Sequence, residues 1–130
     1  MSSSTGTCTI TEQTFGSIKR ITFNWVCGAS SQAHVIPGTS TTNYYDGKIL
    51  QVVICPDSTK APDANYDLEL NDKDTVDQFC GSGANRHTSS TEVLVHSSST
   101  PLGVAIQTKL SLVIANGGSS GSGVTYVYLR

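Results

Sequence analysis

Two acidic residues with spacing suited to acid–base chemistry stand in the segment Asn65–Leu70, where Asp67 and Glu69 are separated by one leucine. On an extended strand such residues share a face and lie about 7 Å apart, which approaches the carboxyl separation of an inverting glycosidase. A small hydrolase would depend on this pair. The same alternation is typical of a strand with one face in water, in which Tyr66 is one of the inward residues. This alternative explains the two acidic residues without a catalytic role.

A second acidic group follows directly, because Asp72, Asp74 and Asp77 occupy one short polar segment. Carboxylates are the ligands that Ca²⁺ prefers, but the spacing lacks the glycine and the distal glutamate of a calcium loop. The sequence predicts no cofactor and leaves open whether this acidic loop binds a cation.

The candidates for nucleophilic or cofactor chemistry are isolated from one another. His34, His87 and His96 lie far apart, and none belongs to a His-x-His or His-Glu-x-x-His motif. Gly81-Ser82-Gly83 lacks the strand-to-helix context of a nucleophile elbow. Gly81-x-Gly83-x-x-Arg86 lacks the third glycine of the dinucleotide fingerprint. We therefore expect a protein that is not an enzyme.

Four tyrosines could form a platform for a carbohydrate: Tyr44, Tyr45, Tyr126 and Tyr128. The alternative is that Tyr126 and Tyr128 are ordinary residues on one face of a strand. In this alternative Tyr44 and Tyr45 cover the core from a loop, which suits a side chain of intermediate burial. The second interpretation is favoured.

Composition excludes several classes of protein. The 130 residues include 34 Ser or Thr but only eight Lys or Arg against ten Asp or Glu, and the net charge is −2. A chain without a basic run has no electrostatic footprint for a phosphate backbone, so no nucleic-acid partner is expected. No basic and apolar leader opens the sequence and no long apolar run follows, so neither export nor a membrane is expected.

The four cysteines are spaced too widely for a zinc site or a disulfide scaffold: Cys8, Cys27, Cys55 and Cys80. Most of them stand in or beside apolar runs. They are interpreted as buried free thiols in a protein that folds in a reducing cytosol.

Hydrophobic periodicity predicts an all-β protein, an antiparallel β-sandwich of about seven strands, jelly-roll-like or immunoglobulin-like. The clearest strand is Ile18–Cys27, in which Ile21, Phe23, Trp25 and Cys27 share one face. The other expected strands are Thr7–Glu12, Lys48–Cys55, Asn65–Leu70, Thr91–His96, Lys109–Ala115 and Val124–Leu129.

Several finer expectations accompany this prediction. The first two strands should pair, and Lys48–Cys55 should be a central strand covered on both faces. Asp74–Phe79 has a possible helical turn, and the last two strands should form a hairpin through the glycine-rich segment Asn116–Gly123.

One domain is expected over residues 8–130, preceded by a polar N-terminal arm over residues 1–7. Residues 28–47 show no periodicity, so they form either a functional loop or a crossing segment with a short strand of its own. Polar segments without periodicity can become ordered when they bind a partner. The candidate partner-binding residues are Ser2, Ser3, Ser4, Thr5, His34, Tyr44 and Tyr45.

Three stretches of the chain resemble small virion structural proteins of tailed bacteriophages. They are Thr9–Glu12 with Gly16–Trp25, Tyr66–Asp74 with Asp77 and Gly83–Arg86, and Gly121–Arg130. The resemblance implies a β-rich capsid cement or decoration protein, made in the host cytoplasm and located on the capsid surface. Residues 28–45 depart from that resemblance.

The implied partner is the major capsid protein, and the symmetry of a shell favours a homotrimer of this chain. The alternative is a phage tail or receptor-binding module that recognises a glycan. Either function would be non-enzymatic.

Overall fold

A computed structural model describes residues 6–28, 36 and 39–130, and these residues form β-strands and loops. Nine strands, and no helix, occur in these ranges, which confirms the all-β prediction. The strands are β1 (Thr7–Phe15), β2 (Ile18–Val26), β3 (Tyr45–Gly47), β4 (Ile49–Pro56), β5 (Asp67–Asn71), β6 (Glu92–Val95), β7 (Ile106–Thr108), β8 (Ser111–Ala115) and β9 (Ser122–Leu129).

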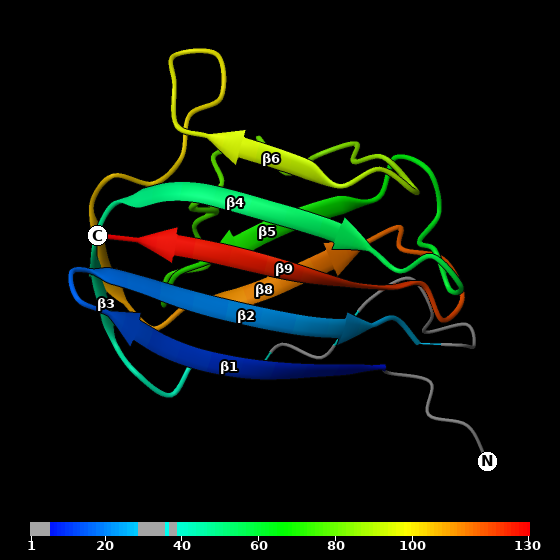
Figure 1. Ribbon diagram of the computed structural model, residues 1–130, viewed down its shortest axis with the longest axis horizontal. Coiled ribbons are helices and arrows are strands. Elements are labelled where there is room, and N and C mark those ends of the chain that lie inside the picture. Colours follow the sequence, from blue (N-terminus) through cyan, green and yellow to red (C-terminus); the bar gives the residue numbers. More distant parts are fainter. Residues whose placement is uncertain (1–5, 29–35, 37–38) are drawn as a thin grey trace.

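The first layer is an antiparallel sheet in the order β1-β2-β9-β4-β6, seen face-on in Figure 1. The predicted pairing of the first two strands is confirmed, and their tight turn contains Gly16 at a φ of 60°. A positive φ suits glycine because it has no Cβ to meet the following carbonyl. The last strand, β9, lies between β2 and β4, so the C-terminal segment is at the centre of the sheet.

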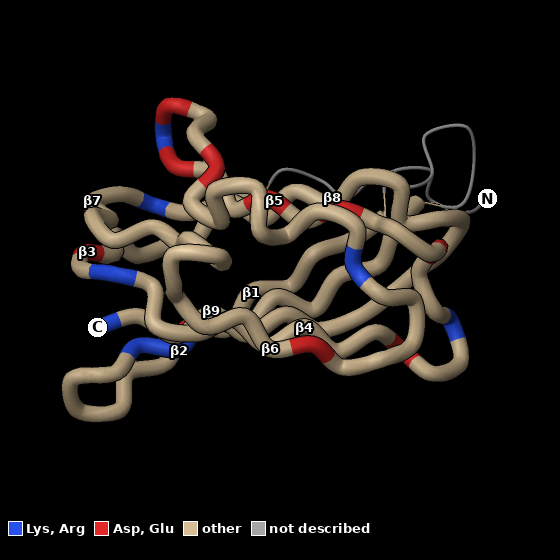
Figure 2. Tube along the Cα trace, turned by 90° about the horizontal axis from the view of Figure 1, so that it is seen from above, with Lys and Arg blue, Asp and Glu red and all other residues tan. Residues whose placement is uncertain are grey.

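The second layer is built from two short antiparallel pairs, β5 with β8 and β3 with β7. Figure 2 shows the two layers edge-on, with β5 and β8 opposite β4 and β9. Loop segments extend this layer: the amide of Leu68 donates to the carbonyl of Gly83, and the amide of Gln78 donates to the carbonyl of Leu70. Backbone groups on the free side of β5 are therefore paired without a further strand.

The core lies between the layers and follows the alternation of the sequence. Ile21, Phe23 and Trp25 of β2 are buried, as are Leu68 and Leu70 of β5. The remaining buried residues that unite the layers include Val52, Ile54, Tyr66, Phe79, Leu102, Leu110, Leu112, Ile114, Val127 and Leu129.

Trp25 joins the two layers at one end of the core. Its ring centroid lies 5.6 Å from that of Tyr66, and its Nε1–H donates to Oγ1 of Thr125 at 3.0 Å. Both side chains of this hydrogen bond are buried, so the only tryptophan of the chain is fixed in orientation as well as position.

Three expectations about local structure are wrong. The last two strands do not form a hairpin, since β8 pairs with β5 in one layer and β9 enters the other, so Asn116–Gly123 crosses between layers. Asp74–Phe79 is not helical, because two aspartates bind its amides in turns. β4 is central but is buried on one face only, and Val53 and Cys55 on its other face are half-buried.

The aperiodic segment before β4 contains a short strand, as one of the two interpretations required. β3 pairs with β7, and Ser40 forms an isolated bridge with Ser111 at the start of β8. The C-terminal part of residues 28–47 therefore belongs to the second layer and connects it to β4 of the first layer. Residues 1–5 of the expected N-terminal arm, 29–35 and 37–38 lie outside the described residues.

Candidate functional site

The two carboxylates considered for hydrolysis have different surroundings. Asp67 accepts hydrogen bonds from the amide of Asn85 at 2.9 Å and from Nδ2 of Asn116 at 2.8 Å. Glu69 is exposed on the same strand. Asp67 thus ties two loops to β5, a structural role that a turn-rich layer requires.

The acidic loop after β5 is organised by its own backbone. Asp72 accepts the amides of Asp74 at 2.8 Å and Val76 at 3.0 Å, and the bond from Val76 lowers the pKa of this carboxyl. Asp77 accepts the amides of Leu70, Phe79 and Gly81. Among the described residues, no three His, Cys, Asp or Glu side chains gather so that they could hold a metal ion.

The two described histidines each accept local backbone hydrogen bonds. Nδ1 of His87 accepts the amides of Ser89 at 3.1 Å and Ser90 at 3.0 Å, and Nδ1 of His96 accepts that of Leu102 at 3.0 Å. Each ring therefore stabilises a turn.

Two of the predicted partner-binding residues, Tyr44 and Tyr45, adopt opposite environments. Tyr44 is 76% exposed, and the ammonium of Lys109 lies 5.3 Å from its ring centroid. Tyr45 is buried, and its hydroxyl donates to Oε1 of Glu12 at 2.7 Å. Burial and this carboxylate raise the pKa of Tyr45 well above its usual value.

Tyr45 therefore covers the core, as the favoured interpretation expected. The same expectation is wrong for Tyr44, whose exposed ring is available to a partner. A hollow of about 320 Å³ lies beside them, lined by both tyrosines, Asp46 and Gln107. The other predicted partner-binding residues, Ser2, Ser3, Ser4, Thr5 and His34, lie outside the described residues.

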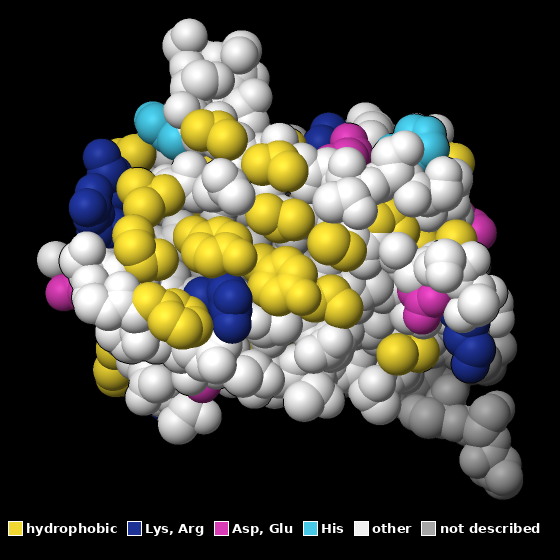
Figure 3. Space-filling model, in the orientation of Figure 1, with side chains coloured by type: hydrophobic (Ala, Val, Ile, Leu, Met, Phe, Trp, Pro, Cys, Tyr) yellow, Lys and Arg dark blue, Asp and Glu magenta, His cyan; other side chains and the backbone are white. Residues whose placement is uncertain are grey.

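The most extensive candidate surface is the outer face of the five-stranded sheet, which no sequence motif indicated. In Figure 1 this face is towards the viewer and no described element crosses it. Figure 3 shows hydrophobic side chains gathered over its middle. We call this the apolar patch; its residues are Phe15, Ile18, Val53, Val93, Val95, Val124, Tyr126 and Tyr128.

The strand register brings the apolar patch together from β1, β2, β4, β6 and β9. Val53 is opposite Val93 on one side and Tyr126 on the other. Val93 and Val95 are 54% and 55% exposed, and Phe15 is 52% exposed. Contiguous exposed apolar residues of this kind mark interaction sites in soluble proteins. The sequence signal for this surface is the apolar character of both faces of Lys48–Cys55, which also fits a strand covered on both faces.

A single cationic side chain lies within the apolar patch. The guanidinium carbon of Arg20 is 4.9 Å from the ring centroid of Phe15 and 5.9 Å from that of Tyr126. Its Nη2 donates to Oε1 of Gln13, the residue opposite it on β1. Two aromatic rings and an amide therefore hold the charge in one place.

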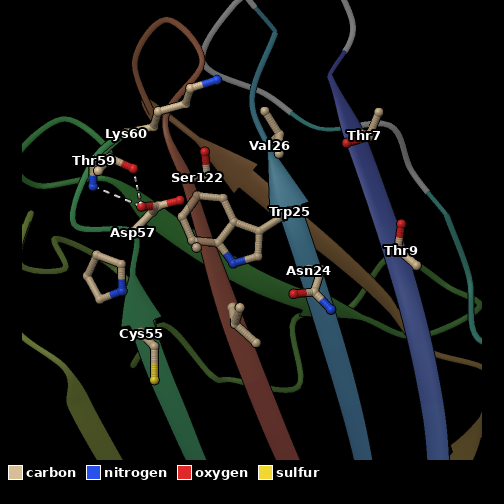
Figure 4. A pocket seen from close by; sticks show the side chains of 13 residues that line it. Thr7, Thr9, Asn24, Trp25, Val26, Cys55, Asp57, Thr59, Lys60 and Ser122 are labelled. Carbon is tan, nitrogen blue, oxygen red and sulfur yellow. Dashed lines mark hydrogen bonds between the residues drawn. The ribbon is translucent and has the colours of Figure 1, made fainter.

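The far end of the same face is hollowed, in the region where β2 ends and β9 begins (Figure 4). The hollow measures about 600 Å³, and its polar lining includes Thr7, Thr9 and Asn24. Asp57 at its rim accepts bonds from the amide and the hydroxyl of Thr59, drawn dashed in Figure 4. No histidine is among the described residues that line it, so Cys55 there has no imidazole to act as its base.

No protein-family model, curated protein or solved structure matches this chain. The part of the chain that the structure describes has no helix long and apolar enough to cross a membrane.

Proposed function

We propose that this protein is a non-enzymatic virion structural protein, a capsid cement or decoration protein that binds and stabilises the head shell of a tailed phage. The observation that carries the proposal is the apolar patch on the outer face of the five-stranded sheet, which nothing in the described chain covers. A broad, regular sheet face can pack against another large protein surface, as two sheets pack face to face in a sandwich. The resemblance of three sequence segments to virion proteins supports the same function.

The charge distribution is consistent with binding to a protein surface. The outward positions of the five strands carry uncharged polar residues (Ser, Thr, Asn and Gln) and apolar residues, with Arg20 as the charged exception. Cores of protein interfaces are depleted of charge and enriched in tyrosine, phenylalanine and arginine, and the apolar patch has this composition. The proposed partner is the major capsid protein, and the proposed location is the capsid surface after assembly in the host cytoplasm.

Symmetry supports a further part of the proposal, that the protein acts as a homotrimer. A cement protein gains avidity when its subunits match a threefold or quasi-threefold position of the shell. Sedimentation equilibrium of the purified chain tests this part, with a mass of three chains expected and a monomer at all concentrations contradicting it.

The experiment that tests the function uses particles from a phage that lacks this gene. Such particles should form but rupture at a lower temperature, because a protein that binds only the assembled shell stabilises it by mass action. Purified protein added back should co-sediment with the particles and restore their thermal resistance. Failure to co-sediment, or binding only to tails, would reject the cement function.

A second candidate function is a tail or receptor-binding module that recognises a glycan. The observation in its favour is Tyr44, whose exposed ring lies beside Lys109 and next to a hollow with polar lining. Exposed aromatic rings flanked by hydrogen-bonding groups suit the apolar face of a sugar. A glycan array distinguishes the two functions, since Tyr44→Ala should abolish any glycan signal without affecting particle binding.

A further inference from the structure

The position of Arg20 is the most specific chemical feature of the apolar patch. It lies on β2 opposite Gln13 of β1 and Tyr128 of β9, so it is inside the sheet rather than on an edge. The rings of Phe15 and Tyr126 flank its guanidinium. Neighbouring apolar side chains displace water from part of the group, which strengthens any ion pair that it forms with a partner.

The hydrogen-bonding capacity of this guanidinium is largely unused within the chain. A guanidinium has five N–H donors, and only the bond from Nη2 to Gln13 is formed with a described residue. Nε is buried without a hydrogen-bond partner. No carboxylate of the described residues lies within 4.0 Å of its nitrogens, unlike Lys19, Lys73 and Arg86, which all form ion pairs.

The guanidinium of Arg20 is held in place, is partly desolvated and has no ion-pair partner among the described residues. These are the properties of an arginine that recognises a partner rather than of a solvated surface charge. A surface arginine normally orders its side chain at an entropic cost when a partner binds. Here the aromatic rings and Gln13 have already ordered the side chain. Because Nε is buried, a partner's carboxylate would bind the N–H groups of Nη1 and Nη2, which these contacts hold in place.

A second copy of this chain is a poor occupant for the patch. The outward positions of the five strands include no aspartate or glutamate among the described residues. Two such faces related by a twofold axis would bring the two Arg20 side chains into one apolar interface without a counter-charge. Charge complementarity therefore favours a different protein.

We propose that the apolar patch binds a protein partner that presents apolar side chains around a single Asp or Glu carboxylate, which pairs with Arg20. The inference rests on the proposed function, in which that partner is the capsid protein. The five strands span roughly 19 Å across, and eight residues of strand roughly 26 Å along, about 500 Å² in plan. A standard interface buries about 800 Å² of accessible surface on each partner, which is more than this plan area, so the contact would use the whole face.

The test measures co-sedimentation of the full chain with particles that lack it, over a range of protein concentrations. Arg20→Ala should weaken binding at least tenfold. Arg20→Lys keeps the charge but loses the planar donors, so its affinity should fall between those of the wild type and Arg20→Ala. Lys73→Ala is the matched control, because Lys73 is an exposed cation in the turn after β5 in the other layer, and it should bind within twofold of the wild type.

Added salt provides a second readout. Binding of the wild type should weaken between 50 and 500 mM NaCl, and binding of Arg20→Ala should be much less sensitive, because the ion pair is what salt screens. Thermal unfolding of each variant verifies the fold, and Arg20→Lys keeps the test decisive if Arg20→Ala unfolds.

Three outcomes reject one statement each. Wild-type protein that fails to bind particles rejects the proposed function. Wild-type protein that binds, with Arg20→Ala and Arg20→Lys binding equally well, rejects the role of Arg20 and leaves the proposed function standing. A wild-type oligomer that dissociates on Tyr126→Asp or Arg20→Ala shows that a second copy covers the patch, which also overturns the inference.

Discussion

The guanidinium of Arg20 lies over the ring of Phe15, with 4.9 Å between its carbon and the ring centroid, on a sheet face that no described segment covers. The pair joins β2 to β1 next to the turn between them. A cation over an exposed aromatic ring contributes only about 0.5–1 kcal/mol to folding. The contact therefore contributes little to stability, and under the proposed function its role is to position Arg20 for a partner.

Removal of Phe15 tests this explanation. Phe15→Ala should lower the free energy of unfolding by no more than about 1 kcal/mol, yet weaken co-sedimentation with particles at least fivefold, because Arg20 loses one flanking ring. Val76→Ala is the control, since Val76 is 54% exposed in the turn region of the other layer. Equal particle binding by Phe15→Ala and wild type would argue that the ring does not position Arg20.

The buried hydrogen bond between Trp25 and Thr125 gives a prediction about stability. Thr125→Val preserves the shape of the side chain but leaves the indole N–H without an acceptor, so we expect a loss of about 1–3 kcal/mol in urea unfolding. Thr22→Val changes the same group on the half-exposed outer face of β2 and should alter stability by less than about 0.5 kcal/mol. Equal effects of the two substitutions would contradict the importance of this bond.

The contacts of Glu12 give a prediction about pH. Burial raises the pKa of this carboxyl, but hydrogen bonds from the amides of Thr42 and Asn43 and from the hydroxyl of Tyr45 outweigh it and lower the pKa below its usual value of 4.5. A pKa lowered by folding contributes stability above the unfolded pKa, and this contribution is lost as pH falls through the folded pKa.

Glu12→Gln should therefore be less stable than the wild type at pH 7, and the difference should shrink below about pH 4 as the wild-type carboxyl takes up a proton. Urea unfolding at several pH values measures this. Glu69→Gln, the same change at an exposed position of β5, is the matched control. A difference that is constant from pH 3 to pH 7 would contradict the account.

The cysteines should react in an order set by burial. Burial raises the pKa of the Cys8 thiol to about 11, and burial together with the charge of Asp63 raises that of Cys27 to about 11. Cys80 is exposed. In native protein at pH 8, mass spectrometry after brief alkylation should find Cys80 modified first and Cys27 unmodified, because the thiolate is the reactive form. Denatured protein should titrate four thiols, and rapid native modification of Cys27 would contradict its burial.

Local periodicity predicted the strands that alternate clearly, but it missed the shortest strands and did not predict which distant strands pair. Ile21, Phe23 and Trp25 are buried as expected because each alternate side chain of β2 meets the same core. β3 and β7 have three residues each, too few to show a period, and their paired residues, such as Tyr45 and Thr108, are far apart in the sequence. Asn116–Gly123 has the composition of a hairpin loop, and no local signal distinguishes a hairpin from a crossing between layers.

The apolar patch around Arg20 could not be predicted from the sequence, because it too depends on which strands are neighbours. Arg20 is a polar residue on the outward side of a strand, which alternation predicts correctly. Arg20 lies beside Tyr126 and Tyr128 only because of the register between β2 and β9, two strands that are far apart in the sequence. Tyr126 and Tyr128 were correctly placed on one face of a strand, but only the sheet order β1-β2-β9-β4-β6 puts Val93 and Val95 on the same surface.

The most direct test of the central claim is a cryo-electron microscopy reconstruction of particles with this protein present and of particles without it. We predict additional density on the head shell, in which the outer face of the five-stranded sheet lies against the capsid protein and a carboxylate of that protein reaches Arg20. Density confined to the tail, or head density in which the apolar patch faces solvent, would contradict the account.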